Sequence, residues 1–160
     1  MMSRTVFTWL TLLGIVVNAA FAGTPIPKSF DATGEDRHAI ETLLSTYTSA
    51  VSTKNQALFE TLLLNRNIPF CGVPATVNSA LAPDGTAQQY ERFRTGVFEG
   101  PPFTQRFQSV HIQQDGLLAQ VSLVFVNSTA QGDTWGWKTM QLLKVAGQWK
   151  IASEFYTGHG

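Results

Sequence analysis

The chain has 160 residues, 44% of them hydrophobic, and equal numbers of basic and acidic side chains, 11 of each. This length fits one domain with a hydrophobic core, and the dispersed basic residues lack the basic stripe typical of nucleic-acid-binding proteins. We therefore expect one domain and no nucleic-acid partner. The three histidines lie in separate segments, and no phosphate-binding or dinucleotide-binding motif is present, so we expect neither a metal site nor a cofactor.

The first 22 residues have the pattern of a secretory signal peptide. Arg4 precedes an apolar run over residues 6–17, and the sequence Ala20-Phe21-Ala22 forms a small-x-small cleavage site before Gly23. The run is shorter than the roughly 20 apolar residues that a membrane span needs. We therefore expect a mature chain of residues 23–160, without a membrane anchor, that is either periplasmic or secreted.

The segments that follow are predicted to be mainly helical. After a tether over residues 23–34, which contains two prolines, Thr33 is expected to cap a helix that runs to about Ser52. A second helix is expected over residues 54–64 and a third over residues 87–97.

Proline and glycine interrupt the segment between the second and third helices. Within it, residues 75–81 are expected to form a short edge strand. Cys71 has no partner for an intramolecular disulfide and is interpreted as a small buried hydrophobic residue, with a reactive thiol as the alternative.

Four strands follow one another through the last third of the chain. They are expected at residues 106–114, 117–127, 133–145 and 148–156, and each joins the next through a glycine-containing turn. An antiparallel sheet of this kind has to bury one face under the helices, which predicts an α+β domain over residues 35–157 with a cavity between the two layers. Residues 158–160 are expected to be a mobile tail.

Three sequence features resemble the nuclear transport factor 2-like superfamily, which includes SnoaL-like proteins and the lumazine-binding-like group. They are the first helix DRHAIETLLSTYTSAVSTKN, the strand pair VHIQQDGLLAQVSLVF and the closing strands LLKVAGQWKIASEFY. The resemblance covers nearly all of residues 36–156. It implies a cone-shaped fold, in which a curved sheet and the helices enclose a small, largely apolar ligand. It also implies a homodimer, since many members pair through the outer face of the sheet.

Two titratable side chains are candidates for general-base catalysis, because some members of this superfamily are enzymes with acids, His and Tyr in the pocket. Strand alternation places His111 on a face with Phe107 and Ser109, and this face is either concave or exposed outward. Glu154 is expected to point outward if Trp149, Ile151 and the residues that alternate with them are buried. Both residues are therefore candidates whose orientation decides their role.

Aromatic side chains are the expected ligand contacts. Trp135 and Trp137 share one strand face and could line the pocket, form a dimer surface or simply pack in the core. Tyr47 lies in the middle of the first helix, with its hydroxyl aimed either into the cavity or into the core. Phe93 on the third helix and Tyr156 on the last strand complete the expected binding set.

These observations support three functional hypotheses. The first is an exported protein that binds a small apolar or aromatic molecule without chemistry. The second is a pocket enzyme of the isomerase, dehydratase or polyketide-cyclase type, with His111 or Glu154 as base and Tyr47 or a Trp nitrogen near the developing enolate. The third is a protein-interaction module, which would have a broad apolar outer face and a filled cavity.

Overall fold

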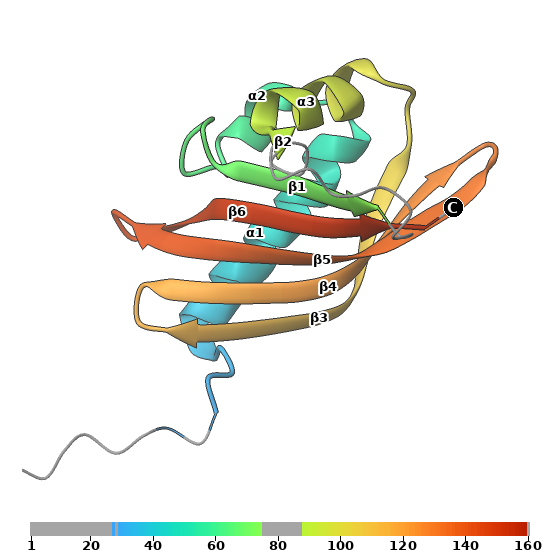
Figure 1. Ribbon diagram of the computed structural model, residues 1–160. Coiled ribbons are helices and arrows are strands. Elements are labelled where there is room, and N and C mark those ends of the chain that lie inside the picture. The colour runs from blue at the N-terminus through green and yellow to red at the C-terminus, as the bar shows by residue number, and fades with distance from the viewer. Residues whose placement is uncertain (1–26, 28, 75–87, 160) are drawn as a thin grey trace, which may run out of the picture.

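The computed structural model describes residues 27, 29–74 and 88–159, in which helices cover one face of a six-stranded sheet (Figure 1). The α+β class is as predicted from the sequence. The predicted signal peptide, residues 23–26 and 28 of the tether, the strand expected at 75–81 and residue 87 of the third helix lie outside the described residues. No helix in the described part of the chain is long and apolar enough to span a membrane.

The first helix, α1 (Gly34–Ser52), lies against the concave face of the sheet. Apolar residues recur every three or four positions along this helix, so they lie on one face, which is buried. The buried residues are Ile40, Leu43, Leu44, Tyr47, Ala50 and Val51. Thr33 precedes the helix with an extended backbone, but its side chain makes no capping hydrogen bond. Asp36 in the first turn instead accepts hydrogen bonds from Lys144 (2.6 Å) and Trp149 (3.0 Å) and so ties the helix to the sheet.

The second helix, α2 (Gln56–Glu60), is shorter than the predicted range 54–64. Lys54 has a positive φ of 56°, which excludes it from a helix, and the Asn55 side chain then caps α2 by accepting a hydrogen bond from the Leu58 N–H. Lys54 donates hydrogen bonds to the carbonyls of Val97 and Pro101, so this corner is connected to the third helical segment.

The third helical segment also differs from the predicted range 87–97. Residues Gln88–Gln89 form the short strand β2, and α3 (Tyr90–Arg94) follows at once and continues as a π-helical turn, η1 (Thr95–Glu99). Tyr90 and Phe93 are its buried residues.

Six strands form the sheet in the order β2-β1-β6-β5-β4-β3. The long strands β3 (Thr104–Asp115), β4 (Leu118–Thr129), β5 (Gly132–Val145) and β6 (Gln148–Gly158) form the predicted antiparallel meander. The sequence did not predict β1 (Pro69–Pro74), which pairs with β6 in parallel, so the sheet is mixed.

The turns of the meander follow the glycines in the sequence. Ala146 and Gly147 both have positive φ, 48° and 79°, as the type I′ hairpin turn requires. Gly116 has a φ of 57° in the turn between β3 and β4, and Gly132 has a φ of 127° where β5 begins.

Two residues of the expected tail over 158–160 belong to the sheet, because Gly158 ends β6 and His159 forms a bridge to Trp135. The backbone groups of Trp135 and His159 exchange two hydrogen bonds of 3.0 and 2.7 Å. The two rings also stack, with their centroids 4.3 Å apart. Residue 160 lies outside the described residues.

Two β-bulges reverse the alternation of side chains along their strands. In β3, Gln108 pairs with Val124 and His111 with Ser122, so Ser109 and Val110 together lie opposite a single residue. Ser109 takes a positive φ of 51° there. The β5–β6 register shifts in the same way between Gln141 and Leu142, which leaves Ala152 as the extra residue of β6.

Candidate functional site

A cavity of about 390 Å³ lies between the α3–η1 segment and the concave face of the sheet. Such a volume falls within the range of small-molecule pockets. The helical segment and the four long strands all contribute to its wall, through Arg92, Phe93, Gly96, Val97, Phe103, Gln105, Phe125, Asn127, Lys138 and Tyr156. We call this space the cone cavity.

A buried ion pair lies at one wall of the cone cavity. Lys138 of β5 and Glu154 of β6 are 3% and 0% exposed, and the ammonium nitrogen lies 2.7 Å from a carboxylate oxygen. Tyr47 of α1 joins them: its hydroxyl donates to the Glu154 carboxylate at 2.9 Å and accepts from Lys138 at 2.7 Å. The three side chains form one network in which each charge has a hydrogen-bonded partner, as burial requires.

Aromatic rings surround the ammonium group of Lys138. Its nitrogen lies 4.6 Å from the ring centroid of Tyr47, 5.1 Å from that of Phe125, and 5.6 Å from those of Phe107 and Tyr156. Contacts of this kind attract a cation to the ring faces. The rings therefore hold a charged group in a largely apolar wall.

Burial shifts the pKa values of the side chains in and beside this network. Removal from water lowers the pKa of Lys138, while the Glu154 carboxylate acts in the opposite direction. Burial, and then the neighbouring Glu154 charge, raises the pKa of Tyr47 well above its ordinary value. The same two causes raise the pKa of Tyr156 to about 12. Both phenols are therefore hydrogen-bond donors at neutral pH.

Gly136 makes room for one wall of the cone cavity. It pairs with Phe125 across the β4–β5 ladder, and its neighbours Trp135 and Trp137 point to the other face. A Cβ atom at this position would lie 2.7 Å from the Phe125 ring and would collide with the Thr157 carbonyl. The glycine thus permits the Phe125 ring to lie over the strand and line the cavity.

Four of the residues singled out from the sequence lie in or beside the cone cavity. Phe93 and Tyr156 line it, and Tyr47 and Glu154 belong to the buried network. The expected outward orientation of Glu154 is wrong, because the Ala152 bulge changes the alternation and turns both Ile151 and Glu154 inward.

The structure places the other three residues on the outer face of the sheet. His111 is exposed there, and because of the Ser109–Val110 bulge it does not share a face with Phe107 as the alternation had predicted. Trp135 and Trp137 are 49% and 55% exposed, so neither packs in the core nor lines the cone cavity. They lie in a row of outward residues opposite Val126 and Val124 of β4.

Lys138 is the member of the buried network that the sequence analysis missed. It alternates with Trp137 and Thr139 and shares the inward face of β5 with Met140 and Leu142, both buried. A cation two positions before the apolar pair Met140 and Leu142 on the same strand face is the signal that could have identified it, because a buried lysine needs a partner.

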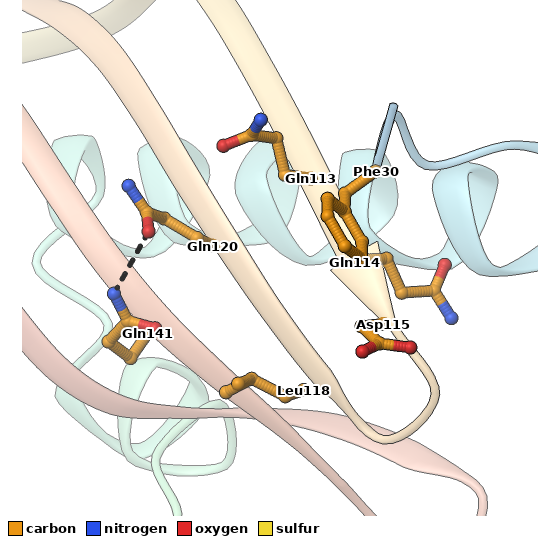
Figure 2. Close-up of a pocket in the computed structure, with 7 residues that line it drawn as sticks. All are labelled: Phe30, Gln113, Gln114, Asp115, Leu118, Gln120 and Gln141. Carbon is orange, nitrogen blue, oxygen red and sulfur yellow. Dashed lines mark hydrogen bonds between the residues drawn. The ribbon is translucent and has the colours of Figure 1, made fainter. Parts of the chain in front are cut away.

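A second, shallower hollow of about 180 Å³ lies on the outer face, near the turn between β3 and β4 (Figure 2). Most of its lining residues are of polar type: Gln113, Gln120 and Gln141 come from three adjacent strands, and Phe30 lies at its side. Gln141 donates to Gln120 at 3.5 Å, a long hydrogen bond. This hollow brings together none of the candidate residues.

Among residues 27, 29–74 and 88–159, no three His, Cys, Asp or Glu side chains are grouped so that they could hold a metal ion. Cys71 is buried in β1, next to β6.

Comparison with known proteins gives relatives in fold only. No protein-family model matches the sequence, and no curated protein matches it. A nuclear transport factor 2-like protein of unknown function from Shewanella baltica superposes with a TM-score of 0.59 at 18% identity, over 81% of this chain and 99% of the other. The chain has the nuclear transport factor 2-like fold.

Two further solved structures share this nuclear transport factor 2-like fold. A protein of unknown function from Nostoc punctiforme, described as cystatin-like in fold, gives a TM-score of 0.62 at 12% identity and covers 81% of this chain and 95% of its own. A Novosphingobium aromaticivorans protein, provisionally named a scytalone dehydratase, gives 0.57 at 14% identity over 78% and 85% of the two chains. At these identities the nuclear transport factor 2-like fold is shared, whereas the chemistry depends on the residues of each site.

Proposed function

We propose that the protein binds a small, mainly apolar or aromatic molecule in the cone cavity, without converting it. The observation that carries this proposal is the cavity itself, about 390 Å³ in volume and walled by Phe93, Val97, Phe103 and Phe125 beside one buried ion pair. Pockets that bind small molecules typically combine apolar walls with a few polar groups that fix the orientation of the ligand.

A neutral fluorescent probe, N-phenyl-1-naphthylamine, tests whether the cone cavity accepts such a molecule. We expect saturable binding by the purified protein and its loss in Val97→Trp, because the indole would fill the space beside Phe103. The matched control is Gln120→Trp, which adds the same side chain to the hollow on the outer face and should leave binding unchanged. Equal binding by all three proteins, or failure of the unmodified protein to bind both this probe and naphthalene compounds, would overturn the proposal.

A pocket enzyme of the isomerase, dehydratase or polyketide-cyclase type is the second candidate, favoured by the Lys138–Tyr47–Glu154 network. Lys138 is the member that lines the cavity, so it is the group that would donate to the enolate oxygen while a water molecule takes the α-proton. Glu154 lies behind it and would hold its charge. This candidate predicts that the protein accelerates exchange of the α-protons of 2-tetralone in D₂O, and that Lys138→Met removes the acceleration. Exchange at the rate of buffer alone would overturn it.

We also propose that two copies of the chain pair through the outer sheet face. Support comes from exposed apolar side chains on neighbouring strands of this face, Trp135 and Trp137 of β5 and Phe155 of β6. A second copy has the same sheet twist and so can stack face to face, and two-fold pairs are the commonest oligomers. An interaction module would have a cavity filled by its own side chains. The cone cavity of this protein is not filled, which argues against that hypothesis.

We propose that the protein is exported after cleavage near Ala22. Support comes from the N-terminal sequence, in which Arg4 precedes a short apolar run and a small-x-small site. Intact mass measurement of the protein from its own host tests this: a chain that begins at Gly23 supports export, and a chain that begins at Met1 overturns it.

A further inference from the structure

The charged side chains that line the cone cavity are positive. Its lining includes two cationic side chains, Arg92 and Lys138, and no acidic side chain among the described residues. Glu154 lies on the far side of Lys138, where it bonds to that ammonium group and to the Tyr47 hydroxyl. A bound molecule therefore meets the positive end of the ion pair.

Lys138 has hydrogen-bonding capacity that the protein leaves unused. A protonated lysine has three N–H donors, and in the described structure two of them are engaged, by Glu154 and by Tyr47, both at 2.7 Å. The ammonium nitrogen also lies within 5.6 Å of the ring centroids of Phe107, Phe125 and Tyr156, and Lys138 lines the cavity, so its third donor is available to a ligand. A ligand oxygen there would complete the coordination of the ammonium group.

Arg92 supplies a second cation at the exposed side of the cone cavity. Its guanidinium makes no ion pair with a described acidic residue, whereas Arg94 two positions later is paired with Glu91 at 2.9 Å and also with Glu99. Arg92 also lies close enough to Tyr156 to oppose the rise in the pKa of that phenol. Among the described residues, Lys138 is paired with Glu154, whereas Arg92 is a cation of the cavity lining that has no acidic partner.

We propose that the ligand of the cone cavity is an aromatic or alicyclic monoanion, such as a carboxylate, whose ring lies against the phenylalanines and whose oxygens meet Arg92 and Lys138. A carboxylate offsets the positive charge of the cavity lining and accepts hydrogen bonds from it, whereas an ammonium compound would add a further positive charge. This inference rests on the proposed function, because it names the chemistry of the molecule bound at the same site.

Three probes of one shape test the proposal: 2-naphthoate, 2-naphthamide and 2-naphthylmethylammonium, titrated by calorimetry at neutral pH and low salt. We expect the carboxylate to bind about tenfold more tightly than the amide, since a hydrogen bond between charged groups is stronger than a neutral one. The ammonium compound should bind most weakly. Added salt should reduce the preference for the carboxylate, because Arg92 is exposed.

Two arginine variants test whether Arg92 causes the preference for the carboxylate over the amide. Arg92→Gln should reduce the carboxylate-to-amide ratio severalfold, and a circular dichroism spectrum equal to that of the unmodified protein would show that the variant is folded. Arg94→Gln removes the same charge from the same helical segment, but Arg94 does not line the cavity, so the ratio should stay as in the unmodified protein.

The outcomes separate the two proposals. If the neutral probe binds but the carboxylate and amide bind equally, or the ammonium compound binds best, the ligand class is wrong and the binding function stands. If neither the neutral probe nor any naphthalene compound binds, the binding function itself is wrong. A carboxylate preference that Arg92→Gln leaves intact overturns the role of Arg92.

Discussion

The ammonium group of Lys138 lies 2.7 Å from the carboxylate of Glu154, although the two residues are not directly paired in the β5–β6 ladder. Lys138 pairs with Tyr156 and Glu154 with Met140, so the contact runs diagonally between neighbouring inward positions. Tyr47 on α1 closes the network from the helical layer. One hydrogen-bonded unit thus connects both layers of the fold at the wall of the cone cavity.

Because Lys138 and Glu154 are buried together, we expect removal of one charge to destabilise the protein more than removal of both. Lys138→Met leaves the Glu154 carboxylate buried without its counter-ion and should lower the free energy of unfolding by about 3 to 5 kcal/mol. The double variant Lys138→Met/Glu154→Leu removes both charges and should recover most of that loss. Urea unfolding followed by circular dichroism measures all three proteins.

Lys144→Met is the control for this series. Lys144 lies on the same strand and pairs with Asp36, but both side chains are 27% exposed, so its loss should cost less than that of Lys138. A double variant no more stable than Lys138→Met alone would contradict the interpretation of the pair as mutually dependent charges.

All three tyrosines of the chain should titrate abnormally. Burial raises the pKa of Tyr47, Tyr90 and Tyr156 above the ordinary value of 10.0, to about 12 for Tyr156. In guanidinium, the unfolded protein should acquire the near-ultraviolet absorbance of tyrosinate between pH 10 and 11. The folded protein should show almost none of this absorbance in the same pH range. Normal titration of the folded protein near pH 10 would show that the phenols are not buried.

Because of these pKa shifts, the stability of the folded protein should vary with pH in the alkaline range. Because the folded state holds these protons more tightly than the unfolded state, the stabilisation is fully present below pH 10 and is lost as the pH rises towards 12. Burial shifts the pKa of Lys138 downward and works in the opposite sense, favouring the folded state as pH rises to 10.5. We expect the three phenols to outweigh this one amine, so the urea midpoint should fall between pH 10 and pH 12. A rising midpoint would contradict this.

Gly136→Ala should destabilise the protein by about 1 to 3 kcal/mol, the usual cost of overpacking. The added methyl group would meet the Phe125 ring at 2.7 Å and also the Thr157 carbonyl, whose backbone has little freedom to move. Thermal unfolding measures the loss. Gly158→Ala is the matched control, because nothing lies within 4 Å of its Cβ position. Equal stability of the two variants would argue against the close packing at Gly136.

Trp137→Ser should weaken pairing of the chain if the outer face is the dimer surface. Trp137 is 55% exposed and lies in the middle of that face, so its removal takes away a large apolar contact. Light scattering at micromolar concentration should report a dimer for the unmodified protein and a monomer for the variant. Leu117→Ser, in the turn between β3 and β4 and 66% exposed, should leave the dimer intact. A monomeric unmodified protein would exclude the proposed pairing.

Local patterns were sufficient for most of the fold. The apolar spacing of α1, the glycine turns and the four long strands depend on interactions between near neighbours, so the sequence predicted them within a few residues. β1 was missed because its proline and glycine residues resemble a loop. Its strand character comes from its pairing with β6, which lies far away in the sequence.

Only the tertiary structure decided which residues face the cavity. A bulge inserts one residue and reverses the alternation beyond it, so Ala152 turns Glu154 inward, and the Ser109–Val110 bulge separates His111 from the face of Phe107. The sequence identified Tyr47 and Glu154 individually. It did not predict their contact with Lys138, because a network among three distant elements exists only when the helix lies across the curved sheet. Periodicity is a local property of the chain, whereas the orientation of a side chain toward a cavity depends on register and packing over the whole sheet.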